Sequence, residues 1–218
     1  MIHLINASKA YRTAAGYRVV LHPTSLSIPS HKSVAILGRN GAGKSTLLKM
    51  IAGVEMPNSG RIVSTGSVSW PVGLSGGASS NMTGRQNARF VAHLNGADED
   101  MIDEFVEDFA ELGPYYDELV STYSSGMRSR LNFGVSFAID FECYLIDEAT
   151  SAGDQWFRDK CLRLFEERRS RSGMLMVSHN PQTIAQYCDM AMVLYDGHLV
   201  PFTNLDEAVN FYCYGSSR

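Results

Sequence analysis

The sequence predicts an α/β fold, with a mostly parallel sheet and helices on its faces. Short apolar segments of strand length alternate with amphipathic segments of helix length, which is the pattern of parallel strands joined by helical crossovers. A glycine-rich loop stands directly between one such strand and the next helix. With 218 residues, of which 44% are hydrophobic and 19% charged, the chain can bury one sizeable core.

The first half of the chain carries alternating strand and helix signals. Apolar runs predict buried strands, amphipathic spacing predicts helices, and a Pro-Asn-Ser-Gly run predicts a turn. Thr83 and Gln86 form a capping-box pattern, which predicts a helix start. The expected elements are a strand at 33–37, a helix at 44–52, a turn at 57–60, strands at 61–64 and 67–70, a Gly- and Ser-rich loop at 71–81 and a helix at 83–94.

The second half begins with an acidic amphipathic helix, in which Ile102, Phe105, Val106 and Phe109 recur at helical spacing. A Gly-Pro pair at 113–114 ends it. Near the C-terminus, an Asp-Gly pair between two apolar runs predicts a β-hairpin. The other expected elements are a helix ending near 139, strands at 143–146 and 174–177, helices at 154–171, 181–188 and 205–214, and the hairpin strands 190–195 and 198–202.

Composition excludes several classes of protein. The 19 basic and 23 acidic residues give a net charge of −4, which offers no general attraction to nucleic acid. No apolar run reaches the roughly 18–20 residues of a membrane span, and no secretory signal is visible at the N-terminus. The four cysteines are widely spaced, unlike a metal site or a disulfide scaffold. These features together favour a reducing cytoplasm.

The charge is unevenly distributed. From Phe90 to Met127 there are ten acidic residues and no Lys or Arg. Two interpretations stay open: a solvated surface helix, as most charge runs are, or a docking face for a basic partner.

A phosphate-binding loop joins the strand at 33–37 to the helix that begins near residue 44. Its glycines let successive N–H groups point at phosphate oxygens, and the helix N-terminus adds partial positive charge. Lys44 is expected near the β- and γ-phosphates, and Ser45 on Mg²⁺. The residues assigned to this site are Gly38, Arg39, Asn40, Gly41, Ala42, Gly43, Lys44, Ser45 and Thr46.

Acidic residues and a histidine follow two other predicted strands. Asp147 and Glu148 end the apolar run 143–146, and parallel strands bring their carboxyl ends to one edge. Asp147 can then hold Mg²⁺, directly or through water, and Glu148 can orient and deprotonate the attacking water. His179 follows the strand at 174–177 and is expected to contact the γ-phosphate. The chain is therefore expected to bind and hydrolyse a nucleoside triphosphate.

The segment Tyr123-Ser124-Ser125-Gly126-Met127 resembles the signature of ATP-binding-cassette (ABC) ATPases, commonly Leu-Ser-Gly-Gly-Gln. A second Leu-Ser-Gly-Gly run, at 74–77, does not open a helix directly and is interpreted as loop. The resemblance implies a P-loop NTPase fold with a RecA-like core and an antiparallel β part. It also implies one nucleotide-binding domain over 1–218, with a helical subdomain at about 82–140. In this family, two copies sandwich two ATP molecules, so Ser124, Ser125 and Gly126 would face the nucleotide of a second copy.

Further positions follow from the resemblance. Tyr11 matches the aromatic residue that stacks on adenine, and Asp154 matches the segment that bridges the two ATP sites. The family usually has a Gln between the strand ending near 70 and the helix at 83, and no Gln stands at 71–82. The motifs at 70–74, 83–87 and 123–128 resemble ATPases of capsular polysaccharide exporters, and related O-antigen and teichoic acid exporters share the last two.

The sequence therefore predicts an ATP- and Mg²⁺-dependent subunit of a capsular polysaccharide exporter, peripheral on the cytoplasmic face of the bacterial inner membrane. The expected partners are two copies of an integral membrane permease, a second copy of this chain and, indirectly, periplasmic and outer-membrane export components, but no nucleic acid. The alternatives are a teichoic acid or O-antigen exporter ATPase, a soluble ABC ATPase without a membrane subunit, and a regulatory nucleotide-binding module without turnover.

Overall fold

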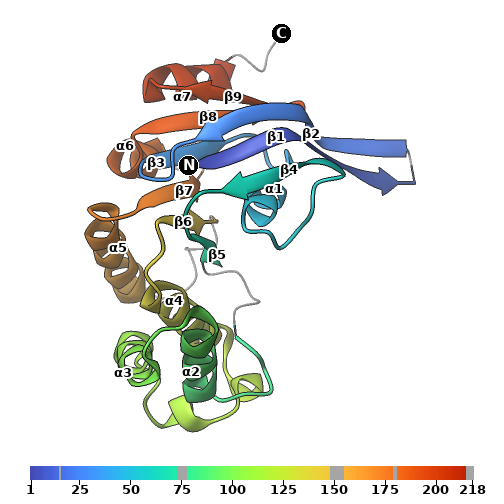
Figure 1. Cartoon of the computed structure of the whole chain (residues 1–218). Helices are drawn as coiled ribbons and strands as arrows, with labels where there is room; N and C mark the ends of the chain where they lie inside the picture. Colours follow the sequence, from blue (N-terminus) through green and yellow to red (C-terminus); the bar gives the residue numbers. More distant parts are fainter. Residues whose placement is uncertain (15, 73–77, 148–154, 179–180, 215–218) are drawn as a thin grey trace. The chain divides into compact units, whose positions relative to one another are not determined.

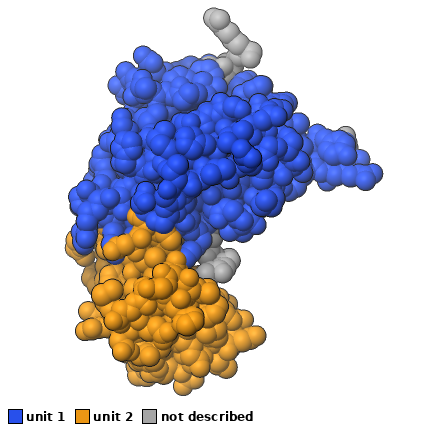
Figure 2. All heavy atoms as spheres, viewed as in Figure 1, with its two compact units in different colours: residues 1–71, 142–148, 166–218 blue, residues 72–141, 149–165 orange. Residues whose placement is uncertain are grey.

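The structure is a computed structural model that describes residues 1–14, 16–72, 78–147, 155–178 and 181–214. The chain forms two compact units (Figure 2): unit 1 holds residues 1–71, 142–148 and 166–218, and unit 2 holds residues 72–141 and 149–165. Each unit has its own core.

Unit 1 contains two sheets (Figure 1). The three-stranded antiparallel sheet has the order β2-β1-β4, and the six-stranded sheet has the order β5-β6-β7-β3-β8-β9. In the larger sheet β6, β7, β3 and β8 run parallel, and β9 returns antiparallel to β8. The strands are β1 (Ile2–Thr13), β2 (Gly16–Ile28), β3 (Ser33–Leu37), β4 (Ser59–Ser64), β5 (Val68–Val72), β6 (Cys143–Ile146), β7 (Gly173–Val177), β8 (Met190–Tyr195) and β9 (His198–Phe202).

The core of unit 1 draws apolar side chains from both sheets and from α1 (Lys44–Ile51). Ile2 and Leu4 of β1, Ile36 of β3 and Leu48 of α1 are each at most 2% exposed. The central strand β3 is buried along its whole length, as expected for a parallel strand covered on both faces. Helices α6 (Pro181–Tyr187) and α7 (Leu205–Tyr214) complete this unit.

Unit 2 is helical. It contains α2 (Gly84–Asn95), α3 (Glu99–Ala110), α4 (Ser125–Ala138) and the 3-10 turns η1 (Gly113–Asp117) and η2 (Val120–Thr122). Most of α5 (Gln155–Arg169) also belongs to it. Its core is aromatic: Phe157 packs edge-on against Phe109 and Phe133, with ring centroids 5.5 and 5.8 Å apart, in the geometry that aromatic pairs prefer.

The predicted α/β class and the predicted core strands are confirmed. The capping box at the start of α2 is present, with Thr83 and Gln86 exchanging side-chain-to-backbone hydrogen bonds. The predicted hairpin is also present, with Ala191 to Tyr195 paired opposite Phe202 to His198. Both Asp196 and Gly197 have positive φ, as a tight two-residue turn requires. The composition and spacing arguments did not predict the long β1–β2 hairpin or the two 3-10 turns.

Two further properties of the described residues bear on function. None of the helices in this part of the chain combines the length and apolarity needed to cross a membrane. Cys143, Cys161 and Cys188 are buried, whereas Cys213 on α7 is exposed. Burial raises the pKa of each of the three buried thiols to about 12.

Candidate functional site

The glycine-rich loop between β3 and α1 has the backbone of an anion-binding loop. Gly41 and Gly43 have φ of 77° and 106°, a left-handed region that only glycine adopts without strain. Lys44 is 7% exposed, and its ammonium donates hydrogen bonds to the carbonyl oxygens of Gly38 (2.6 Å) and Arg39 (3.1 Å). The lysine side chain is therefore folded back along the loop, with its positive charge held beside the backbone of the predicted phosphate site.

The β1–β2 hairpin packs tightly against this loop. A Cβ atom built on Gly43 would lie 2.3 Å from Cγ1 of Val20 on β2, which is far inside van der Waals contact. Gly43 is thus required both for its backbone conformation and for its close approach to the hairpin.

A pocket of about 380 Å³ lies over the loop. Lys44, Ser45 and Thr46 come from the start of α1, and Asp147 directly follows β6. Parallel strands bring these groups to one edge of the sheet. The complete lining is Tyr11, Arg18, Val20, Asn40, Gly41, Gly43, Lys44, Ser45, Thr46, Asp147 and Val177.

The oxygen donors in this pocket suit a magnesium ion. Ser45 supplies a hydroxyl and Asp147 a carboxylate, and both side chains line the same space as Lys44. Hard oxygen ligands of this kind are those that Mg²⁺ selects, with water and substrate phosphate completing its shell. The residues present therefore fit the expected metal.

Tyr11 stands at the side of the pocket, with 37% of its surface exposed. Its hydroxyl donates a hydrogen bond to Glu55, whose carboxylate also binds Lys9 at 2.8 Å. Hydrogen bonds from Lys9 and Tyr11 lower the pKa of Glu55, while desolvation and the contact with Glu55 raise the pKa of Tyr11. The Lys9 ammonium also lies over the Tyr11 ring, 5.1 Å from its centroid. These contacts hold the ring in place at the side of the pocket.

Some of the predicted loop residues line a second space, on the side of the loop that faces the β8–β9 turn. Arg39 and Ala42 line a separate space of about 430 Å³. Asn40 and Gly41 line both spaces. Gly38 lines neither, and a Cβ atom built on it would lie 2.6 Å from the carbonyl oxygen of Leu194. The loop thus has one face toward Tyr11 and another toward the β8–β9 turn.

Three predicted catalytic or binding residues, Glu148, Asp154 and His179, lie outside the described residues. Their assigned roles stay predictions.

The signature-like segment forms the start of α4 in unit 2. Ser124 is the N-cap, and its hydroxyl oxygen accepts a hydrogen bond from the Met127 N–H at 3.2 Å. Ser124 and Ser125 are exposed and Gly126 is half-buried. An exposed small-residue turn at a helix N-terminus can bind an anion, and capping leaves the Ser124 O–H proton available for donation.

Tyr123 stands where the common signature has Leu, and it packs against Gly84 of the Thr83-Gly84-Arg85 segment. Tyr123 is 3% exposed and donates a hydrogen bond to the Tyr115 carbonyl at 2.7 Å. A Cβ atom on Gly84 would lie 2.8 Å from the Tyr123 hydroxyl and 2.6 Å from the Tyr116 ring. The glycine of the Thr-Gly-Arg motif and the tyrosine of the Tyr-Ser-Ser-Gly motif therefore pack together inside unit 2.

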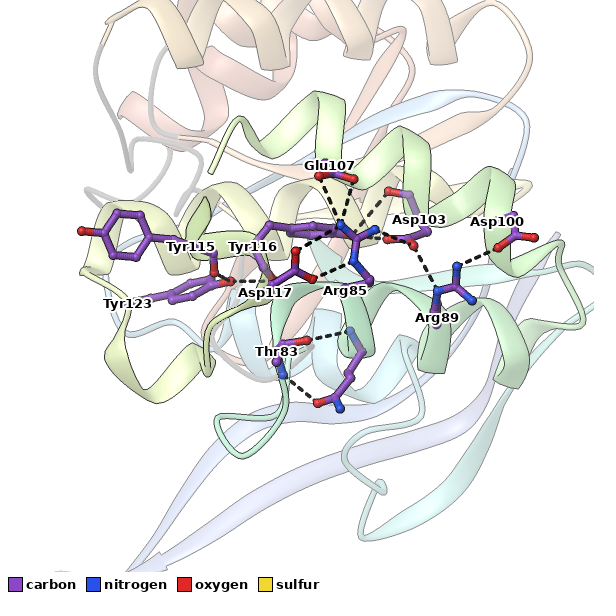
Figure 3. Close-up of polar contacts among 11 residues, drawn as sticks. Thr83, Arg85, Arg89, Asp100, Asp103, Glu107, Tyr115, Tyr116, Asp117 and Tyr123 are labelled. Carbon is purple, nitrogen blue, oxygen red and sulfur yellow. Dashed lines mark hydrogen bonds and ion pairs between the residues drawn. The ribbon is translucent and has the colours of Figure 1, made fainter. Parts of the chain in front are cut away.

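Arg85, the next residue of that motif, is the centre of an ion-pair network (Figure 3). Its guanidinium binds Asp103 at 2.9 Å, Asp117 at 2.7 Å and Glu107 at 3.2 Å, and lies over the Tyr116 ring. The hydrogen bonds that Arg85 donates, first to Asp117 and then to Asp103, raise its pKa further. The arginine thus joins α2, α3 and η1.

Asp103 is the buried member of the network, with its side chain 5% exposed. It binds Arg85 and Arg89 and accepts a hydrogen bond from the Tyr116 hydroxyl at 2.9 Å. Burial and this contact with Asp103 raise the pKa of Tyr116.

These ion pairs bear on the two interpretations of the acidic segment from Phe90 to Met127, a solvated surface helix or a docking face. Three basic side chains from outside the segment bind its carboxylates: Arg85 and Arg89 of α2, and Lys160 of α5. These three bases pair with half of its ten acidic residues, namely Asp100, Asp103, Glu107, Glu111 and Asp117. Much of the acidic charge therefore serves the internal structure of unit 2.

We expect Asp103→Asn to destabilise the chain by about 2 kcal/mol, because two arginines lose a buried charged partner. Urea unfolding followed by helical circular dichroism measures this loss. Glu104→Gln is the matched control, since the adjacent Glu104 is exposed, and it should change stability by less than about 0.5 kcal/mol. Equal effects of the two variants would contradict a structural role for the network.

Motif reasoning missed Arg18, Val20 and Val177, which also line the pocket. Arg18 and Val20 reach it only because β2 folds back along β1. Recognition of residues 2–13 and 16–28 as paired strands is the signal that would have found Arg18 and Val20.

Comparisons with known proteins show the family to which this chain is similar. The profile of the family described as "ABC transporter" matches residues 21–151. The chain is 47% identical to the polysialic acid transport ATP-binding protein KpsT of Escherichia coli, over 97% of this chain and 96% of KpsT. It is also 47% identical to the capsule polysaccharide export ATP-binding protein CtrD of Neisseria meningitidis serogroup B, over 97% of this chain and 98% of CtrD.

A solved structure has the same fold. It is described as the dimeric post-hydrolysis state of the ATP-binding cassette MJ0796 bound to ADP and Pi, and it matches with a TM-score of 0.76 at 20% identity. The match covers 91% of this chain and 96% of that chain.

Proposed function

Because this chain belongs to the ABC transporter family, we propose that it is the ATP-hydrolysing subunit of an exporter that moves capsular polysaccharide across the bacterial inner membrane. The observation that carries this proposal is the similarity, over nearly the full length, to two ATP-binding proteins of polysaccharide transport. The pocket over the phosphate loop, with Lys44, Ser45 and Asp147 in its lining, supports the ATP binding that such a role needs.

Nucleotide binding is assigned to the loop and the hairpin. Backbone N–H groups of the loop and the Lys44 ammonium bind the phosphates, and Tyr11 stacks on adenine. Ser45 and Asp147 hold Mg²⁺, which supplies charge neutralisation for the phosphates. These side chains line one pocket in unit 1, which supports a single binding site.

Hydrolysis is assigned to Glu148 and His179. Glu148 follows Asp147 directly in the sequence, so it is one position beyond the Mg²⁺ ligand. It orients a water molecule and accepts its proton while the water oxygen attacks the γ-phosphorus and ADP leaves. His179 contacts the γ-phosphate oxygens and holds the group in line.

The site is completed by a second copy of the chain. Ser124, Ser125 and Gly126 of one copy bind the γ-phosphate held by Lys44 of the other, and Asp154 bridges the two sites. The exposure of the Ser124 turn and its position at the N-terminus of α4 support this assignment. ATP thus joins the two copies, and hydrolysis releases them.

The transport path belongs to a separate integral membrane permease, with two copies per exporter. Loop 71–81 and the exposed acidic residues of α3 are assigned to contact with that permease. The chain then works at the cytoplasmic face of the inner membrane, where ATP is available.

Export is tested in cells that lack this chain. We expect loss of surface polysaccharide and accumulation of the same glycan inside the cell, measured by glycan staining of intact and lysed cells. Wild-type chain should restore export, whereas Lys44→Ala should not, because export requires ATP. Lys49→Ala, on the exposed side of the same helix, is the matched control and should restore it.

The glycan that accumulates separates the close alternatives. Accumulation of teichoic acid or O-antigen instead of capsule would assign the chain to one of those exporters. Normal surface polysaccharide without the chain would overturn a role in export and favour a soluble ATPase.

A further inference from the structure

Arg18 stands beside the candidate nucleotide pocket and belongs to none of the sequence motifs. It lies on β2 directly opposite Tyr11 of β1 in the antiparallel register. Directly paired residues of adjacent strands project to the same face of a sheet. Arg18 and Tyr11 therefore share a face, and both line the pocket over the phosphate loop.

The next pair along the hairpin provides a contrast. Arg12 is paired with Tyr17, one position nearer the end of the hairpin on each strand, so these two side chains project to the opposite face. Neither lines the pocket. The hairpin thus carries one arginine toward the phosphate loop and one away from it.

The Arg18 guanidinium reaches the loop itself. It donates a hydrogen bond to the carbonyl oxygen of Gly41, a residue of the predicted phosphate site. Within the described part of the chain, no carboxylate forms an ion pair with Arg18. An arginine has five N–H donors and a permanent charge, so one carbonyl uses only a small part of its capacity.

We propose that Arg18 binds phosphate oxygens of the nucleotide, as a second side-chain cation beside Lys44. This inference rests on the proposed ATP-binding function and adds a contact to it. A guanidinium binds phosphate with charge-assisted, directional hydrogen bonds. The Arg18 guanidinium already contacts Gly41 of the loop that is assigned to the phosphates. The hairpin then binds both ends of the ligand: Tyr11 the base and Arg18 the phosphates.

The test uses the purified full chain and two non-hydrolysable triphosphates, AMPPNP and GMPPNP, each with Mg²⁺. Arg18→Gln should weaken the binding of both by about 10- to 100-fold, because a charged hydrogen-bond donor is lost. Arg18→Lys keeps the charge and should recover part of the affinity. Arg12→Gln is the matched control and should bind as the wild type does. Isothermal titration calorimetry measures each dissociation constant.

Two results would overturn the inference. If Arg18→Gln binds AMPPNP as tightly as Arg12→Gln does, Arg18 makes no contact with the nucleotide. If it weakens AMPPNP alone and leaves GMPPNP unchanged, Arg18 reads the base and not the phosphates. A failure of the proposed function is distinct from both, since the wild-type chain would then bind neither nucleotide.

Discussion

An alanine at position 44 should abolish ATP hydrolysis and lower the affinity for ATP by roughly 100-fold or more. The physical reason is the position of Lys44, which is buried and whose ammonium is hydrogen-bonded to the Gly38 and Arg39 carbonyls of the loop. When phosphate binds, this charge offsets the negative charge that the loop must accept. Calorimetry with ATP and a phosphate-release assay measure the two effects.

Lys49→Ala is the control for this experiment. Lys49 lies on the same helix α1 but is exposed, so its removal should change neither affinity nor turnover appreciably. A Lys44→Ala chain that still hydrolyses ATP at the wild-type rate would show that this loop is not the catalytic phosphate site.

The variant Glu148→Gln should bind ATP normally and lose turnover by roughly 100-fold or more, since it removes the group that accepts the proton of water. It should also accumulate as an ATP-bound dimer, because binding joins two copies and hydrolysis is the step that separates them. Single-turnover phosphate release and size-exclusion chromatography with light scattering measure these results.

Glu142→Gln is the matched control. Glu142 stands just before β6, at the opposite end of the strand from Glu148. The control should therefore retain turnover and return to the monomer once its ATP is hydrolysed. A Glu148→Gln chain that stays monomeric in ATP and hydrolyses it at the wild-type rate would contradict both the catalytic role and the ATP sandwich.

The parts of the fold that the sequence predicts correctly depend on local chemistry. The Thr83–Gln86 capping box joins residues three apart, and the Asp196-Gly197 turn needs only two residues of positive φ. Signals of this kind are visible in a short window of sequence. The phosphate loop is predictable for the same reason.

The β1–β2 hairpin is harder to predict because its alternation is interrupted. Asn6 has a φ of 48°, and the β1–β2 register shifts between Leu4 and Ala7. Such a bulge moves the buried positions from even to odd residues, so Ile2 and Leu4 are followed by Ala7 and Lys9. A search for strict alternation of buried and exposed residues along all of β1 therefore fails, although the residues on each side of Asn6 alternate in this way.

The network around Arg85 was missed for a different reason. Its partners are 18 to 32 positions away in the sequence, and they meet only after α2 and α3 pack against each other. The sequence shows an excess of acidic residues after Phe90 but not which of them Arg85 and Arg89 neutralise. Tertiary pairing of this kind requires the structure.

The contrast among the cysteines has a practical consequence for the dimerisation experiments. A thiol reacts with maleimides as its thiolate, so Cys143, Cys161 and Cys188, buried and with pKa values of about 12, should remain unlabelled in the folded chain. Cys213 is exposed on α7 and should take one fluorophore. The natural sequence thus provides a reporter position, and energy transfer between donor- and acceptor-labelled copies can follow their association in real time.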